Sequence, residues 1–217
     1  MRVVFCVSGN GLLFRAAVAR RAELAIEPAL LVARPNAAAD LEDFCAAHGV
    51  PIHRFARIPR EAFDRTISEV CIGANADLVS LTFDRIIPPA VVAHYARRII
   101  NVHPSLLPSF AGTNGAADTL KNGARFGGAT IHEVVDEVDA GPIIAQCAVA
   151  TIPGESAEAF GKRMFRLLEP MYLQVLKWYA EGRVGHDDAG RVVIRGARYG
   201  ELPIAPSLEA FTPRESV

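Results

Sequence analysis

Short apolar runs alternate with longer amphipathic segments along the first hundred residues. The runs are rich in β-branched and aromatic residues, which is typical of strands, and they cover residues 3–7, 30–33, 50–55, 77–81 and 99–103. Between them apolar positions recur every three or four residues, which predicts helices over residues 12–21, 38–48, 59–74 and 89–96. Strands that alternate with helices indicate βαβ units, so the expected fold is α/β, doubly wound, with a mostly parallel sheet.

Beyond residue 103 the pattern is interrupted and then resumes. Prolines and glycines punctuate residues 104–115, and they precede a short expected helix over residues 116–122. Two further strands are expected over residues 128–135 and 142–152.

A long helix closes the main part of the chain. Ser156 is a suitable N-cap and Gly182 a suitable C-terminal residue for it. After it we expect a short hairpin, with its turn at residues 186–190, and a mobile tail. The expected organisation is one main domain over residues 1–182, followed by a hairpin and tail over residues 183–217.

Composition and charge limit the class of protein. Of 217 residues, 51% are hydrophobic and 22% are charged, the balance of a globular chain that buries a core. The 23 Lys and Arg residues against 24 Asp and Glu give a formal charge of -1 without a long run of one sign, so no nucleic-acid partner is expected. The first apolar run is too short for a signal peptide or a membrane span, which favours a cytoplasmic protein without a membrane partner.

The cysteines indicate neither a disulfide framework nor a zinc site. All four stand singly in apolar surroundings, without a C-x-x-C pair: Cys6, Cys45, Cys71 and Cys147. We expect reduced, structural thiols.

A glycine-rich turn follows the first strand and opens the first helix. Backbone N–H groups of Gly9, Asn10 and Gly11 are placed there to meet an anion. A dinucleotide fingerprint needs glycine at position 14, where the chain has Phe14, so NAD binding is not expected. The alternative is that these residues form only a tight strand-to-helix turn.

The fifth strand carries the strongest candidates for catalysis. Asn101 and His103 are two positions apart, so both side chains project from one face of the strand, at the carboxyl end where open α/β sheets bind ligands. An amide donor beside an imidazole polarises a carbonyl and stabilises an oxyanion. Asp139, in an Asp-Ala-Gly-Pro turn, is then expected to face His103 and collect a proton. The alternatives are a structural histidine and an Asx-turn that only organises the loop.

These segments resemble the folate-dependent formyltransferase family. The specific part of the match is the run from Asn101 to Pro108, Asn-Val-His-Pro-Ser-Leu-Leu-Pro, followed by Asp-Ala-Gly-Pro at residues 139–142. Residues 7–11, 84–87 and 128–132 support it in the family's order and roughly its spacing. The resemblance covers about residues 3–183 and is closest to the members that formylate glycinamide ribonucleotide in purine biosynthesis.

The resemblance implies formyl transfer from the co-substrate 10-formyltetrahydrofolate to a small amine, without a metal. The catalytic residues would be Asn101, His103 and Asp139. The residues implied to bind the folate border its pterin or form the loop opposite, with His132 positioning that loop: Arg85, Ile86, Ile87, His132, Asp136, Val138, Ala140 and Gly141. The acceptor would bind at the first turn, at Gly9, Asn10, Gly11 and Leu12.

The acceptor half departs from the family pattern. The family's first turn continues with Ser and Asn, whereas this chain has Leu12 and Leu13. The family's acidic residue in the late helix aligns with Leu168, and residues 113–118 lack its histidine-containing pattern. Glycinamide ribonucleotide is therefore the default acceptor, with an amino sugar or a hydroxylated ornithine as alternatives.

Other functions within and outside this chemistry stay open. A formyltetrahydrofolate hydrolase would use water as the acceptor, and a non-catalytic folate-binding relative would perform no transfer. A transfer-RNA formyltransferase is disfavoured, because only about 35 residues follow the main domain and the net charge is -1. The expected partners are the amine and the folate, and the chain is expected to be a monomer or a homodimer.

Overall fold

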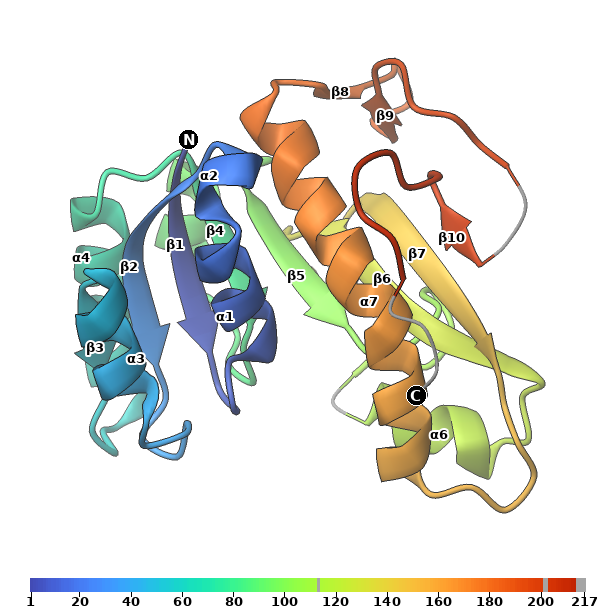
Figure 1. The fold of residues 1–217 in the computed structure, drawn as a ribbon. Helices are drawn as coiled ribbons and strands as arrows, with labels where there is room; N and C mark the ends of the chain where they lie inside the picture. Colours follow the sequence, from blue (N-terminus) through green and yellow to red (C-terminus); the bar gives the residue numbers. More distant parts are fainter. Residues whose placement is uncertain (113, 201–202, 214–217) are drawn as a thin grey trace. The chain divides into compact units, whose positions relative to one another are not determined.

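The computed structural model describes residues 1–112, 114–200 and 203–213 (Figure 1). The contacts between these residues group the chain into two compact units. The first unit contains Met1–Asn101 and Val134–Val138, and the second contains Val102–Glu133 and the chain from Asp139 onward. Thr113, in the segment expected to differ from the family, lies outside the described residues, as do residues 214–217 of the expected tail. The expected domain boundary at residue 182 stays a prediction.

The first unit is built on a parallel sheet, as the alternating pattern predicts. Its strands are β1 (Arg2–Val7), β2 (Glu27–Ala33), β3 (Ile52–Arg54), β4 (Leu78–Thr82) and the first three residues of β5 (Ile99–His103), whose last two residues belong to the second unit. They are ordered β3-β2-β1-β4-β5, and every neighbouring pair is parallel. β1 is central and buried from Val3 to Val7, which explains its uninterrupted apolar run.

Helices cover both faces of this sheet. They are α1 (Leu12–Ala19), α2 (Arg21–Leu24), α3 (Leu41–His48), α4 (Arg60–Gly73) and α5 (Pro89–His94). Phe5 of β1 contacts Phe14 of α1, with ring centroids 5.2 Å apart. The neighbouring Val4 belongs to the core cluster that contains Phe63 and Ile67 of α4. Because successive strand residues face opposite sides, the fold is doubly wound, as predicted.

Two element boundaries differ from the sequence pattern for a visible reason. The helix expected from residue 38 begins at Leu41, because the Arg54 side chain donates to the carbonyls of Arg34, Ala37 and Ala38 and holds that segment as a loop. The strand expected from residue 30 begins at Glu27, and a register shift against β1 accommodates Pro28, which lacks an N–H.

The second unit combines an antiparallel sheet with the long helix. Its elements are α6 (Gly115–Lys121), β6 (Phe126–Glu133), β7 (Ile143–Ala150), α7 (Ala157–Ala180), β8 (Val184–His186), β9 (Val192–Ile194) and β10 (Ile204–Ala205). β7 pairs antiparallel with both β6 and β10, and β8 and β9 form the expected hairpin. β10 was not predicted: its Ile204 pairs with Cys147 and is buried.

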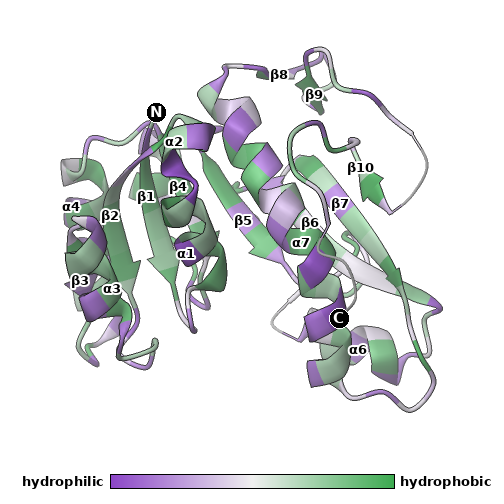
Figure 2. Cartoon of the chain, viewed as in Figure 1, coloured by the Kyte–Doolittle hydropathy of each residue, from purple (hydrophilic) through white to green (hydrophobic). Residues whose placement is uncertain are grey.

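Helix α7 has the cap and the amphipathic pattern expected of it. Ser156 Oγ accepts a hydrogen bond from the Ala159 N–H at 3.1 Å. Hydrophobic and hydrophilic residues alternate along its surface in Figure 2. Its buried side chains, Phe160 and Trp178 among them, pack against β6 and β7. Within the described chain, no helix combines the length and apolar character that crossing a membrane requires.

Candidate active site

His103, the last residue of β5, is buried with one ring nitrogen committed to the backbone. Its Nε2 lies 3.1 Å from the carbonyl oxygen of Phe110. A carbonyl only accepts, so Nε2 carries the hydrogen and Nδ1 is left for another partner. Phe110 presents this carbonyl from a left-handed conformation, with φ +56°. Such backbone geometry is unusual away from glycine and occurs at functional sites.

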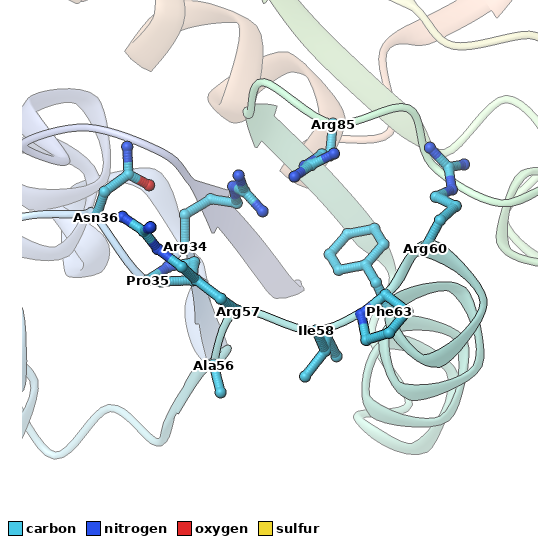
Figure 3. A pocket seen from close by; sticks show the side chains of 10 residues that line it. Arg34, Pro35, Asn36, Ala56, Arg57, Ile58, Arg60, Phe63 and Arg85 are labelled. Carbon is cyan, nitrogen blue, oxygen red and sulfur yellow. The ribbon is translucent and has the colours of Figure 1, made fainter.

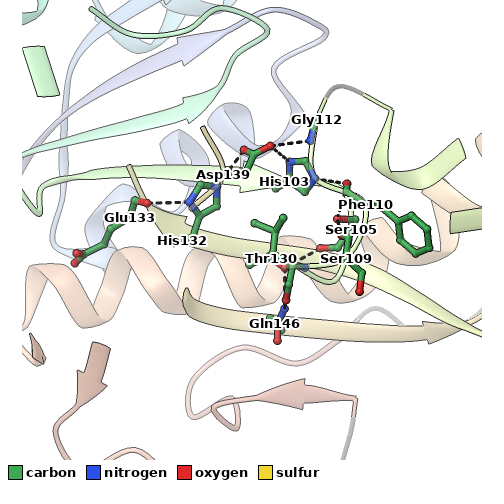
Figure 4. A network of polar contacts seen from close by, with 11 residues as sticks. His103, Ser105, Ser109, Phe110, Gly112, Thr130, His132, Glu133, Asp139 and Gln146 are labelled. Atoms are coloured by element: carbon green, nitrogen blue, oxygen red, sulfur yellow. Dashed lines mark hydrogen bonds and ion pairs between the residues drawn. The ribbon is translucent and has the colours of Figure 1, made fainter. Parts of the chain in front are cut away.

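Asp139 faces the free nitrogen of His103, as the sequence predicts (Figure 4). Its Oδ2 lies 3.5 Å from His103 Nδ1 and accepts a hydrogen bond from the Gly112 N–H at 2.9 Å. Its Oδ1 lies 3.7 Å from His132 Nε2. The Asp139 side chain is 9% exposed, so a single largely buried carboxylate stands between two imidazoles.

His132, on β6, is held in the same way as His103. Its Nδ1 donates to the carbonyl of Glu133 at 2.8 Å, which leaves Nε2 facing Asp139. Burial lowers the pKa of His132, while the Glu133 carbonyl and the Asp139 charge oppose that shift. A neutral His132 therefore presents an unprotonated Nε2 to the carboxylate.

The distances from Asp139 to the two histidines indicate which chemistry this cluster can support. At 3.5 and 3.7 Å the two imidazole–carboxylate contacts are longer than ordinary N–H···O hydrogen bonds. A water molecule or a reacting amine can therefore bridge them, as in many sites that tighten only with substrate bound. The geometry suits a carboxylate that collects a proton between two bases.

A buried polar network behind His103 fixes the loop that follows it. Thr130 Oγ1 donates to the Ser105 carbonyl at 2.7 Å and accepts from the Leu107 N–H at 3.0 Å. Gln146 Nε2 donates to Thr130 Oγ1 and to the Leu107 carbonyl, both at 2.9 Å. Sequence reasoning missed Thr130 and Gln146. For Gln146 the signal was a polar residue inside an otherwise apolar strand, β7.

The glycine-rich turn after β1 lies in the first unit, and its structure changes what is expected of Leu12 and Leu13. Gly11 has φ +69° and precedes α1 without a side-chain cap, while Asn10 Oδ1 accepts from the Leu12 N–H at 3.3 Å. Leu12 is 46% exposed, whereas Leu13 is only 5% exposed and belongs to the core. The two leucines are thus not equivalent, and only Leu12 is placed to contact a ligand.

Arg85 lines a strongly basic cavity of about 540 Å3 in the first unit (Figure 3). Four arginines surround it: Arg34, Arg57, Arg60 and Arg85. Arg34 pairs with Asp84 at 2.9 Å and Arg60 with Asp64 at 2.7 Å. In the described chain no ion pair involves Arg57 or Arg85. The cavity therefore holds a surplus of positive charge.

Sequence reasoning missed the other three arginines of this cavity. A signal was available for two of them, because Arg34 and Arg57, like Arg85, follow the carboxyl end of a parallel strand. Of the two isoleucines expected beside Arg85, Ile86 is 58% exposed and Ile87 is buried.

The loop expected to form the opposite wall is mostly exposed. Asp136, Val138 and Ala140 are open to solvent. Gly141 is packed so closely that a Cβ there would lie 1.7 Å from the Glu133 carbonyl oxygen, so this position requires glycine. Among the described residues, no group of three or more His, Cys, Asp or Glu side chains is arranged to hold a metal ion.

Comparison with known proteins places this geometry in a family. The family model described as formyl transferase matches residues 1–176. Phosphoribosylglycinamide formyltransferase of Escherichia coli is 39% identical over 132 residues, which cover 60% of this chain and 62% of that protein. The match thus spans less than two thirds of this curated relative.

Two solved structures share the fold. Phosphoribosylglycinamide formyltransferase from Anaplasma phagocytophilum has a TM-score of 0.81 at 31% identity, covering 90% of this chain and 95% of its own. A formyltetrahydrofolate deformylase from Pseudomonas syringae has a TM-score of 0.78 at 29% identity, covering 89% of this chain and 65% of its own. With a family model over four fifths of its length and the expected fold, the chain belongs to the formyl transferase family.

Proposed function

We propose that this protein transfers the formyl group of 10-formyltetrahydrofolate to the amine of glycinamide ribonucleotide. The observation that carries the proposal is the Asp139 carboxylate between His103 Nδ1 and His132 Nε2. The names of the E. coli and A. phagocytophilum relatives supply formyl transfer and the acceptor, and the P. syringae neighbour is named for a formyltetrahydrofolate.

The reaction assigns a role to each side chain. The acceptor amine attacks the formyl carbon, a new C–N bond forms, and an oxyanion develops on the formyl oxygen. The Asn101 amide and a protonated His103 stabilise that oxyanion. Since Nε2 of His103 already donates to Phe110, its donor to the oxyanion would be Nδ1–H.

Proton transfer then completes the exchange. Asp139 accepts the proton of the attacking amine, directly or through water, and relays it to the departing nitrogen, N10, as the C–N10 bond breaks. His132 faces Asp139 from the other side, with its unprotonated Nε2 3.7 Å from Oδ1. No side chain needs to become acylated in this scheme.

The basic cavity supports a folate as the co-substrate. A folate carries glutamyl carboxylates, and arginine is the side chain best suited to bind carboxylates through paired hydrogen bonds. Arg57 and Arg85, without acidic partners in the described chain, are the cations that would receive them.

An assay of tetrahydrofolate release tests the reaction and its acceptor. We expect release from 10-formyltetrahydrofolate only when glycinamide ribonucleotide is present, with formation of the formylated nucleotide. Equal release without any amine would identify a hydrolase instead. Release only with an amino sugar or a hydroxylated ornithine would replace the acceptor and keep the transfer.

Leu12→Ser tests whether the first turn limits use of the nucleotide. A hydroxyl at this exposed position adds a hydrogen bond to the acceptor's phosphate, and such bonds to charged groups are worth about 1.5 kcal/mol or more. We expect kcat/KM for glycinamide ribonucleotide to rise about tenfold with folate affinity unchanged. Leu12→Ala is the matched control, since it removes the leucine without adding the hydroxyl. Equal gains in both variants would show that the leucine only obstructs the site.

A further inference from the structure

Glu133 is a buried carboxylate that the mechanism above does not use. It is the last residue of β6 and is 1% exposed. Burying a carboxylate is costly unless partners satisfy it. The Tyr179 hydroxyl of α7 donates to its Oε1 at 3.1 Å, and His186 Nε2 of β8 lies 2.9 Å from its Oε2. The carboxylate therefore ties the end of β6 to the long helix and to the terminal hairpin.

The Tyr179 hydroxyl remains a donor to this carboxylate. Burial, together with the adjacent charge of Glu133, raises the pKa of Tyr179 well above its usual value. The phenol consequently stays protonated and remains a donor to the carboxylate.

The backbone of Glu133 closes the loop that carries Asp139. Its N–H donates to the Pro142 carbonyl at 2.9 Å, so the two ends of the loop meet at this residue. Its carbonyl accepts the Nδ1–H of His132 at 2.8 Å, and Gly141 packs directly against that carbonyl. Figure 4 shows the carbonyl directed to His132 and the side chain extending away from the cluster.

We infer that Glu133 is a positioning residue for the formyl transfer. Its side chain, anchored by Tyr179 and His186, holds in place the peptide carbonyl that keeps the His132 hydrogen on Nδ1. Nε2 is thereby directed at Asp139 as an acceptor. This inference rests on the proposed function for its kinetic consequence, but the state of the His132 ring can be observed without turnover.

Two mild variants test the inference. Tyr179→Phe removes one donor to the carboxylate, and Glu133→Gln keeps the shape but removes the charge. With the carboxylate less firmly held, the Glu133 peptide shifts and His132 gains the Nε2–H tautomer. We expect kcat to fall about tenfold, the lower end of the loss seen when a group that orients a metal-bound histidine is removed, with both KM values within twofold of wild type.

A buried tyrosine elsewhere supplies the matched control. The Tyr95 hydroxyl, in the first unit, donates to the Cys71 carbonyl at 2.7 Å. Tyr95→Phe therefore removes the same kind of buried hydrogen bond at a position outside the site. We expect it to lower the melting temperature without changing kcat or the His132 ring.

The readouts are steady-state kinetics and the ring 15N chemical shifts of His132 in labelled protein. Wild type should show the Nδ1–H tautomer, and the two variants should show a growing Nε2–H fraction alongside the loss of kcat. A retained tautomer, or a retained kcat with only a lower melting temperature, would overturn the inference. If wild type transfers no formyl group to any amine, the proposed function fails. The chemical shifts still decide whether Glu133 positions His132.

Discussion

Asp139 combines an uncommon backbone conformation with a carboxylate that faces both His103 and His132. Its φ is +56°, in the left-handed region that Asp and Asn tolerate better than other side chains. Asn therefore keeps the loop geometry while removing the charge and the proton acceptor.

We expect Asp139→Asn to lower kcat by at least ~10²-fold, the scale of a positioned acid or base. Binding of a folate analogue, measured by calorimetry, should change little. Asp188→Asn, at an exposed position in the hairpin turn, is the matched control and should leave both quantities unchanged. Wild-type turnover in Asp139→Asn would reduce Asp139 to a residue that organises its loop.

His132 makes stability depend on pH in a defined direction. Burial lowers the pKa of His132 in the folded state below the usual value of about 6.5. As pH falls, the unfolded chain therefore binds a proton at a higher pH than the folded state does. The free energy of unfolding should therefore fall below pH ~6.5, until the lower folded-state pKa is passed. Above pH ~6.5 His132 is neutral in both states, so it does not make the free energy of unfolding depend on pH.

Replacing His132 by Asn removes this contribution. We expect the free energy of unfolding in urea to depend less on pH just below ~6.5 in His132→Asn than in wild type. His94→Asn is the control, since that imidazole on α5 is exposed to water in the folded state. The same slope in His132→Asn and wild type would contradict a neutral buried His132.

At the scale of elements, the basic cavity depends on three loops that leave the same edge of the parallel sheet. These loops follow β2, β3 and β4 and carry Arg34, Arg57 and Arg85 respectively. Arg54 braces the first of them by donating to its carbonyls. The sheet order therefore concentrates charge that is dispersed along the chain.

Arg57→Gln tests the assignment of this cavity to the folate. Removing one guanidinium that has no acidic partner among the described residues should raise KM for 10-formyltetrahydrofolate about tenfold and leave kcat and the KM of the amine unchanged. Arg65→Gln, on the exposed side of α4, makes the same charge change outside the cavity and is expected to have no effect. A higher KM for the amine alone would reassign the cavity to the acceptor.

For the whole molecule, all four cysteines are free and buried, three in the first unit and Cys147 in the second. Burial raises the pKa of Cys45 and of Cys147 to about 11, which keeps both as unreactive thiols at neutral pH. We expect iodoacetamide to label the native protein very slowly and all four thiols quickly in urea. Mass spectrometry of the labelled peptides reports which unit opens first, and rapid labelling of the native protein would contradict the packing.

The sequence by itself determined the local structure and the identity of the catalytic candidates. The strand β1, the Ser156 cap and the hairpin with its turn at residues 186–190 are all confirmed, because the pattern that predicts each lies within a few neighbouring residues. The strand ending in His103 and the loop bearing Asp139 were predicted for the same reason, and the structure brings the two together.

The tertiary structure decided everything that depends on distant residues. The tautomers of His103 and His132 follow from the carbonyls of Phe110 and Glu133, which only the folded loops bring into place. Leu13 resembles Leu12 in sequence but lies in the core, because the helix turns it inward. The partners of Glu133 are 46 and 53 residues away in the chain. The spacing of apolar residues predicts which side of a helix or strand is buried. It does not predict these contacts, because they depend on which loops the order of the strands places side by side.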